Sequence, residues 1–118
     1  MKRITVFFAL IFSLSLIVES CGKCECLKST DPCDGLAFKF AADIQPIINT
    51  RCATSPGCHG VGSVNSGGPL TNYTEVFNKR EEIKIQVSSN SMPFPPDTLA
   101  SDQKAKIICW INSGAPNN

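Results

Sequence analysis

One stretch of sequence, CATSPGCH at residues 52–59, decides how the rest of the chain is interpreted. A c-type haem requires a cysteine that forms a thioether at the porphyrin edge and, next to it, a histidine whose imidazole reaches the iron. Cys58 and His59 provide that adjacent pair, and His59 is the only histidine in the chain. Cys52 is separated from Cys58 by five residues, where the usual motif has two. The stretch therefore predicts a haem attachment site with a loop that bulges outward between its cysteines.

A methionine further along the chain offers a second iron ligand. Met92 is the only methionine apart from the initiator, and it lies in the proline-rich segment 91–96. Histidine and methionine together are the axial ligands of low-spin electron-transfer haems. A lone methionine usually fills a gap in a core, but Met92 lies outside any periodic apolar face and next to prolines that hold a loop extended. We therefore expect Met92 to be the distal ligand.

The segments before and after residues 52–59 have helical patterning. Asp43 is expected to cap a first helix that has Pro46 in its first turn and an apolar face formed by Ile44, Ile47 and Ile48. Residues 54–69 are rich in Gly, Ser, Asn and Pro and are expected to form a loop. A short helix should follow, because apolar side chains recur at i, i+3 and i+4 in Tyr73, Val76 and Phe77.

The C-terminal half is also expected to be helical. Residues 83–87 fit either a helix face or an alternating strand, and we favour the helix. After a loop at 88–96, Ser101 should cap the last helix and Gly114 should end it, with one face formed by Ala105, Ile108 and Ile111. The sequence thus predicts an all-α fold of three or more short helices with long loops, and long loops in a small domain usually hold something.

The N-terminus has the features of an export signal. Two basic residues precede an apolar run at 4–18, which is shorter than the roughly 20 residues needed to cross a bilayer. Residues 1–20 are therefore predicted to be a signal peptide. The following segment, VESCG at 18–22, resembles the lipobox of bacterial lipoproteins. That resemblance implies that Cys21 is lipidated and anchors the mature chain to a membrane.

Size and charge exclude several classes of function. Without residues 1–20, 98 of the 118 residues remain, which is enough for one small domain. Nine basic and nine acidic residues then balance, so no basic face for nucleic acid is expected. A Gly-rich phosphate loop is missing from the sequence, and a single histidine makes a Ser/His/Asp hydrolase improbable. The balanced charge leaves a redox partner unidentified.

Motifs spread over residues 38–118 resemble the small mono-haem cytochrome c domains of bacterial cell-envelope proteins: IQPII at 44–48, CHG at 58–60, MP at 92–93 and CWINSGA at 109–115. The resemblance implies a class I cytochrome c-like fold in which the helix before the haem motif crosses the C-terminal helix. It also implies one covalent haem c with thioethers at Cys52 and Cys58, His59 as proximal ligand and Met92 as distal ligand. Trp110 and Phe94 would pack against the haem.

The implied protein is an electron carrier, not an enzyme, anchored in the bacterial envelope and exposed to the periplasm, with another redox protein as partner. Residues 21–37 form its cysteine-containing tether. If the haem takes Cys52 and Cys58, disulfides are expected among Cys24, Cys26, Cys33 and Cys109, in a pairing that sequence does not determine. Because the resembling fold packs the first helix beside the last, a Cys52–Cys109 disulfide with haem on Cys58 alone is the alternative.

Two other functions compete with haem binding. A zinc site could be assembled from Cys52, Cys58, His59 and Cys109, although neighbouring residues would both have to turn onto one ion and an oxidising envelope removes thiolates. The second competitor is a disulfide-stapled binding lipoprotein without a cofactor. A peroxidase-like or sensor role would need an open sixth coordination position, which Met92 would fill. We favour haem binding.

Overall fold

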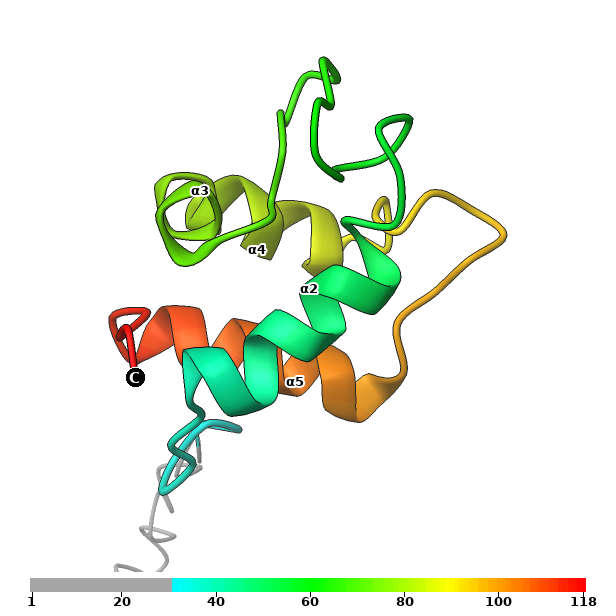
Figure 1. The fold of residues 1–118 in the computed structure, drawn as a ribbon. Helices are drawn as coiled ribbons and strands as arrows, with labels where there is room; N and C mark the ends of the chain where they lie inside the picture. Colours follow the sequence, from blue (N-terminus) through cyan, green and yellow to red (C-terminus); the bar gives the residue numbers. More distant parts are fainter. Residues whose placement is uncertain (1–30) are drawn as a thin grey trace, which may run out of the picture.

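A computed structural model describes residues 31–118, so the predicted signal peptide, Cys21, Cys24 and Cys26 lie outside the described residues. Within this range the chain is helical and has no strand. A π-helical turn, η1, leads into the first α-helix, and three more helices follow in the order η1 (Phe40–Ile44), α2 (Gln45–Arg51), α3 (Tyr73–Asn78), α4 (Arg80–Ser88) and α5 (Ser101–Asn112) (Figure 1). The predicted all-α class is confirmed for these residues.

The first helical segment begins earlier than the sequence indicated. Asp43 does not cap it from outside, because the helical turn already starts at Phe40. The Asp43 carboxylate instead accepts a hydrogen bond of 2.9 Å from the backbone N–H of Lys39, and so closes the first turn from within. The Phe40 N–H donates to the side-chain oxygen of Asn118 at 3.0 Å. The end of the chain thus supplies a partner for this helix start.

Helices α3 and α4 follow the sequence pattern. Asn72 caps α3 by accepting a hydrogen bond of 3.1 Å from the Glu75 N–H. The ambiguous segment 83–87 lies within α4, so the preference for a helix is confirmed. Val87 is buried in the core, whereas Ile85 is 64% exposed, which explains why an alternating apolar pattern occurs on a helix.

Helix α5 differs from the expectation at its start and on its buried face. Ser101 is the first helical residue and not the cap, because Ala100 takes the cap position and its N–H donates to the Gln103 side chain at 3.1 Å. Ala105 is exposed and Ile108 only half-buried. The buried residues of this helix are Ile107, Cys109, Trp110 and Ile111. Gly114 has a φ of +95° and ends the helix as predicted.

The core forms where η1 and α2 pass over α5 (Figure 1). Phe40 packs against Trp110 with ring centroids 5.5 Å apart and against Tyr73 at 5.1 Å. The Tyr73 hydroxyl donates to the Ala115 carbonyl at 3.0 Å, which joins α3 to the C-terminal segment. The other large apolar residues of the core include Ile44, Ile48, Val76, Val87, Leu99 and Ile107. This core lies to one side of the two long loops, which connect α2 to α3 and α4 to α5 (Figure 1).

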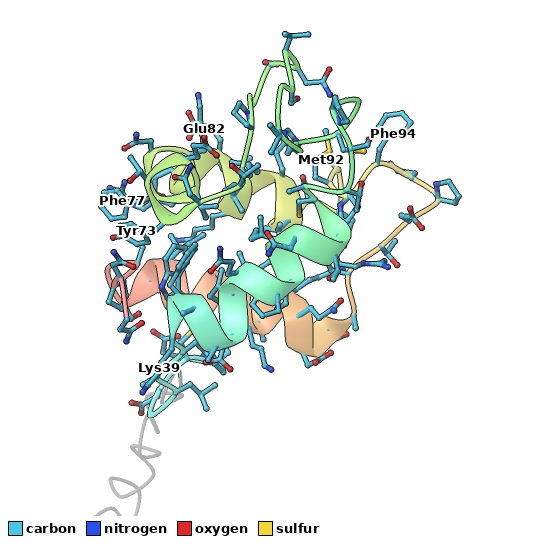
Figure 2. The ribbon with its side chains drawn as sticks, viewed as in Figure 1. Lys39, Tyr73, Phe77, Glu82, Met92 and Phe94 are labelled. Atoms are coloured by element: carbon cyan, nitrogen blue, oxygen red, sulfur yellow. A yellow bond between two sulfur atoms is a disulfide. The ribbon has the colours of Figure 1, made fainter. Side chains whose placement is uncertain are left out.

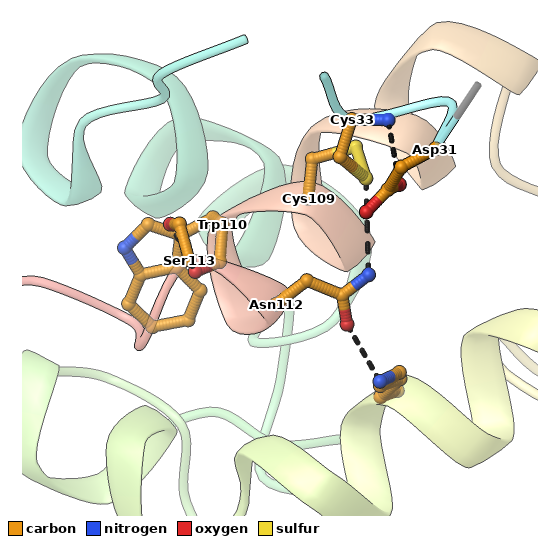
Figure 3. The surroundings of a disulfide bond; sticks show 7 residues. Asp31, Cys33, Cys109, Trp110, Asn112 and Ser113 are labelled. Carbon is orange, nitrogen blue, oxygen red and sulfur yellow. Dashed lines mark hydrogen bonds between the residues drawn. A yellow bond between two sulfur atoms is a disulfide. The ribbon is translucent and has the colours of Figure 1, made fainter. Parts of the chain in front are cut away.

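A disulfide fastens the N-terminal segment to the last helix. Cys33 is bonded to Cys109 of α5, 76 residues away in sequence (Figure 3). The Asn112 side chain next to it contacts the Cys33 sulfur at 3.8 Å and accepts a hydrogen bond of 2.6 Å from Lys84 of α4. The predicted tether is therefore fixed to the helical core from Cys33 onward. The alternative Cys52–Cys109 pairing is not formed.

Candidate functional site

One cavity is lined by all four residues that were expected to bind a haem covalently or through its iron: Cys52, Cys58, His59 and Met92. It has a volume of about 490 Å³ and lies between the end of α2, the loop after it and the loop that precedes α5. An adjoining cavity of about 320 Å³ extends toward α4. Both volumes fall in the range of small-molecule sites. The two cavities share five lining residues: Cys52, His59, Ser66, Gly67 and Met92.

His59 is oriented by a backbone carbonyl. Its Nδ1 lies 2.8 Å from the Gly68 oxygen, and because a carbonyl oxygen only accepts, Nδ1 carries the proton. In the tautomer with its proton on Nδ1, Nε2 has a free lone pair. Metal-binding histidines commonly have this second contact, which sets the ring orientation and its tautomer. His59 is thus prepared to ligate a metal through Nε2.

The long spacing between the two cysteines is absorbed in a closed loop. The His59 N–H donates to the Cys52 carbonyl at 3.0 Å, so the two ends of the loop lie next to each other. Inside it, the Ser55 carbonyl accepts from the N–H groups of Cys58 at 3.0 Å and Gly60 at 2.8 Å. The five residues between the cysteines therefore form a closed loop that returns the chain to Cys52.

The two thiols of this loop have different environments. Cys52 is half-buried, and burial raises its pKa to about 11, with Arg51 lowering it and Cys58 raising it further. Cys58 is exposed, and hydrogen bonds from the Thr54 and Ser55 side chains lower its pKa. Neither cysteine is in a disulfide, so both sulfurs are available for a covalent bond.

Polar residues after the histidine hold the loop in place, and the sequence did not identify them. Ser63 donates to the Cys58 carbonyl at 2.6 Å. The Asn65 side-chain amide donates to the carbonyls of Gly57 at 2.6 Å and Cys58 at 2.9 Å. Their only sequence signal is the Gly, Ser and Asn content of residues 54–69, which indicates a loop but no particular contact.

Gly67 allows the imidazole to lie close to the backbone. A Cβ atom at this position would be 2.7 Å from Cε1 of His59 and 3.2 Å from Nδ1. Such distances are well below ordinary van der Waals contact, so a side chain here would displace the ring or the loop. Gly67 and Gly68 together form the backbone support of His59.

Met92 lies at the border between the two cavities. Its backbone N–H donates to the Gln86 carbonyl at 3.3 Å, which attaches the methionine loop to the end of α4. The side chain is 37% exposed. Phe94 also lines the larger cavity and is 78% exposed, and it lies next to Met92 where the two long loops meet (Figure 2).

Trp110 does not belong to this site. Its ring is buried against Phe40, and its Nε1–H donates to the Pro116 carbonyl at 3.0 Å. It lines neither cavity. The expectation that Trp110 packs against a haem is therefore wrong, because the indole instead forms the centre of the helical core.

Charged residues lie at both ends of the combined cavity. Arg51 and Asp97 line the larger part, and the Arg51 guanidinium donates to the Thr98 carbonyl at 2.7 Å. Lys79 and Glu82 line the smaller part together with Leu70, Ile83, Gln86 and Val87. The site thus combines apolar residues with charged groups in both of its parts.

The zinc site considered above is not assembled. Cys109 is bonded to Cys33, which removes one of the four expected ligands. Among residues 31–118, no three His, Cys, Asp or Glu side chains lie close enough together to hold a metal ion. In the same range, no helix has the length and apolar character required to cross a membrane.

The chain was also compared with known proteins. No protein-family model, no curated protein and no solved structure matches it. Its function is therefore inferred from the cavity and from the residues that line it.

Proposed function

We propose that this protein binds one haem c covalently and carries single electrons in the bacterial cell envelope. One observation carries the proposal. His59, whose Nδ1 is engaged by Gly68, lines the same cavity as Met92, so a nitrogen and a sulfur donor border one space. This is the ligand pair of low-spin electron-transfer haems.

The residues around the cavity are suitable for the cofactor. Cys58 is exposed next to His59 and would form one thioether. Cys52 lines the same cavity and would form the second, because the closed loop returns the chain to it. Because Gly67 has no side chain, it leaves room for the imidazole close to the backbone. A class I cytochrome c-like fold is part of this proposal.

The axial ligands determine which kind of haem protein this would be. The bound haem supplies a one-electron couple at the iron. If His59 and Met92 both ligated the iron, they would leave no position for peroxide or a diatomic ligand. The proposed role is therefore that of a carrier that exchanges electrons with another envelope protein, and not that of an enzyme.

The test is production of the chain together with a c-type haem maturation system. Haem that resists acid-acetone extraction is expected, with a pyridine haemochrome spectrum typical of thioether-substituted vinyls. The double variant Cys52→Ala/Cys58→Ala should lose the covalent haem. Cys52→Ala should retain haem on a single thioether, with the spectrum shifted toward one free vinyl. Complete extraction of the colour from the unmodified protein would refute the proposal.

The disulfide favours a second candidate function, that of a stapled binding module without haem. The Cys33–Cys109 bond stabilises a small core whether or not a cofactor is present. The same preparation separates the candidates, because a folded, colourless protein with free Cys52 and Cys58 thiols would support the module.

Anchoring at Cys21 completes the proposal. It rests on the apolar run that ends before Cys21 and on the lipobox-like residues around it. Replacement of Cys21 by Ser should abolish lipid attachment and release the protein from membranes. A Cys21→Ser protein that is still processed and membrane-bound would contradict this part.

A further inference from the structure

The smaller cavity has a charged end that the proposed function does not yet use. Lys79, at the start of α4, and Glu82, one turn later, both line it, and their charged atoms are 4.0 Å apart. Their side chains are 42% and 63% exposed, so this ion pair is weak. Both groups can therefore respond to a third charge placed in the cavity.

Cys52 lines both parts of the cavity, so the position of Cys58 alone gives the cavity a direction. Cys58 lines only the larger part, whereas Lys79 and Glu82 line only the smaller part. Glu82 and Phe94 accordingly lie on opposite sides of Met92 (Figure 2). A haem has its vinyl groups at one edge and its two propionate carboxylates at the other. A ring attached through Cys58 would thus direct its carboxylates away from Cys58.

We propose, on the basis of the proposed haem function, that Lys79 is the cation that binds a haem propionate and that Glu82 opposes it, so that this pair sets the reduction potential. The competing cation is Arg51, whose Nε is buried and has no hydrogen-bond partner among the described residues. Arg51 lines the end of the cavity that holds Cys58, and its guanidinium is already bound to the Thr98 carbonyl. The direction of the ring therefore favours Lys79.

The sign of the effect follows from charge. The oxidised haem iron has one more positive charge than the reduced iron, so a nearby cation stabilises the reduced form and a nearby anion the oxidised form. Lys79→Gln should consequently lower the reduction potential, and Glu82→Gln should raise it. Lys79→Arg keeps the charge and should retain most of the original value.

Two residues of the same helix provide matched controls. Lys84 directs its ammonium group to Asn112 at 2.6 Å, toward α5 and not into the cavity. Glu81 lies beside Arg80 at 3.8 Å and does not line the cavity. Lys84→Gln and Glu81→Gln change the net charge in the same way, so they report the general effect of charge on the haem.

The experiment is a potentiometric titration of the haem-loaded full chain and of these variants, with redox mediators and with the visible spectrum as a check on iron ligation. We expect the Lys79→Gln and Glu82→Gln shifts to have opposite signs and to exceed those of their controls. The inference would be overturned if the reduction potential shifted no more in Lys79→Gln and Glu82→Gln than in the controls Lys84→Gln and Glu81→Gln. A larger downward shift in Arg51→Gln than in Lys79→Gln would also overturn it. A protein without covalent haem would refute the proposed function itself, whereas a haem protein with equal shifts would refute only this inference.

Discussion

The ring of His59 is held by the carbonyl oxygen of Gly68, 2.8 Å from Nδ1. The backbone of the same residue is fixed on both sides, because its N–H donates to Cys52 at 3.0 Å and its carbonyl accepts from Leu70 at 2.8 Å. Three contacts thus fix the position of the histidine. A preorganised ligand loses little conformational freedom when it coordinates a metal.

Gly67→Ala should disturb this arrangement. The added methyl group would meet Cε1 of His59 at 2.7 Å, and overpacking of this kind costs about 1–3 kcal/mol. We expect a lower free energy of unfolding in urea and weaker haem incorporation. Gly57→Ala is the control, because the added methyl group would be 3.7 Å from its nearest neighbour, the Ser55 hydroxyl, which is an ordinary van der Waals distance. Equal stability of the two variants would show that the ring does not depend on Gly67.

Loss of the disulfide should destabilise the fold without changing the site. A cross-link between Cys33 and Cys109 restricts the unfolded chain over 76 residues, and such bonds contribute about 2–4 kcal/mol. The double variant Cys33→Ser/Cys109→Ser should unfold at lower urea concentration, with an unchanged haem spectrum. A reductant should destabilise the unmodified protein and leave the double variant unaffected. If the reductant did not change the unfolding midpoint of the unmodified protein, this result would argue against the disulfide.

The start of α3 should make stability depend on pH. Hydrogen bonds from the backbone and hydroxyl of Thr71, at 2.7 and 2.9 Å, lower the pKa of Glu75. Because the folded pKa is the lower one, this contribution is complete above the ordinary glutamate pKa and is lost as the pH falls through the folded value. Glu75→Gln should reduce the acid dependence measured by urea unfolding. Glu81→Gln, which removes a carboxylate that is 65% exposed, is the matched control.

The sequence predicted correctly those features of the structure that depend on neighbouring residues. The i, i+3, i+4 spacing of Tyr73, Val76 and Phe77 predicted α3, and the φ of +95° at Gly114 explains why the last helix ends where it was expected to end. Cys58, His59 and Met92, which the sequence singled out, line one cavity. Each of these features depends on a few neighbouring residues.

Features that depend on distant partners could not be predicted. The first helical turn starts at Phe40 because Asn118, 78 residues later, accepts from its N–H. Which face of α5 is buried depends on the segments that pack against it. Trp110 therefore packs against Phe40 in the core and does not line the cavity. The pairing of Cys33 with Cys109 likewise follows from the folded arrangement of two distant segments.

Met92→Ala tests the proposed electron-carrier function most directly. Loss of the thioether should open the distal position, lower the reduction potential and permit carbon monoxide to bind. The fold should survive, because the Met92 side chain is 37% exposed on a loop and contributes little to the core. Phe94→Ala is the control, since Phe94 lines the same cavity and is 78% exposed but has no atom that could ligate iron. It should keep the spectrum of a six-coordinate haem. An unchanged spectrum and potential in Met92→Ala would show that another group ligates the iron or that the haem is five-coordinate. If the haem is five-coordinate, its open sixth position would fit a sensor or peroxidase role better than electron transfer.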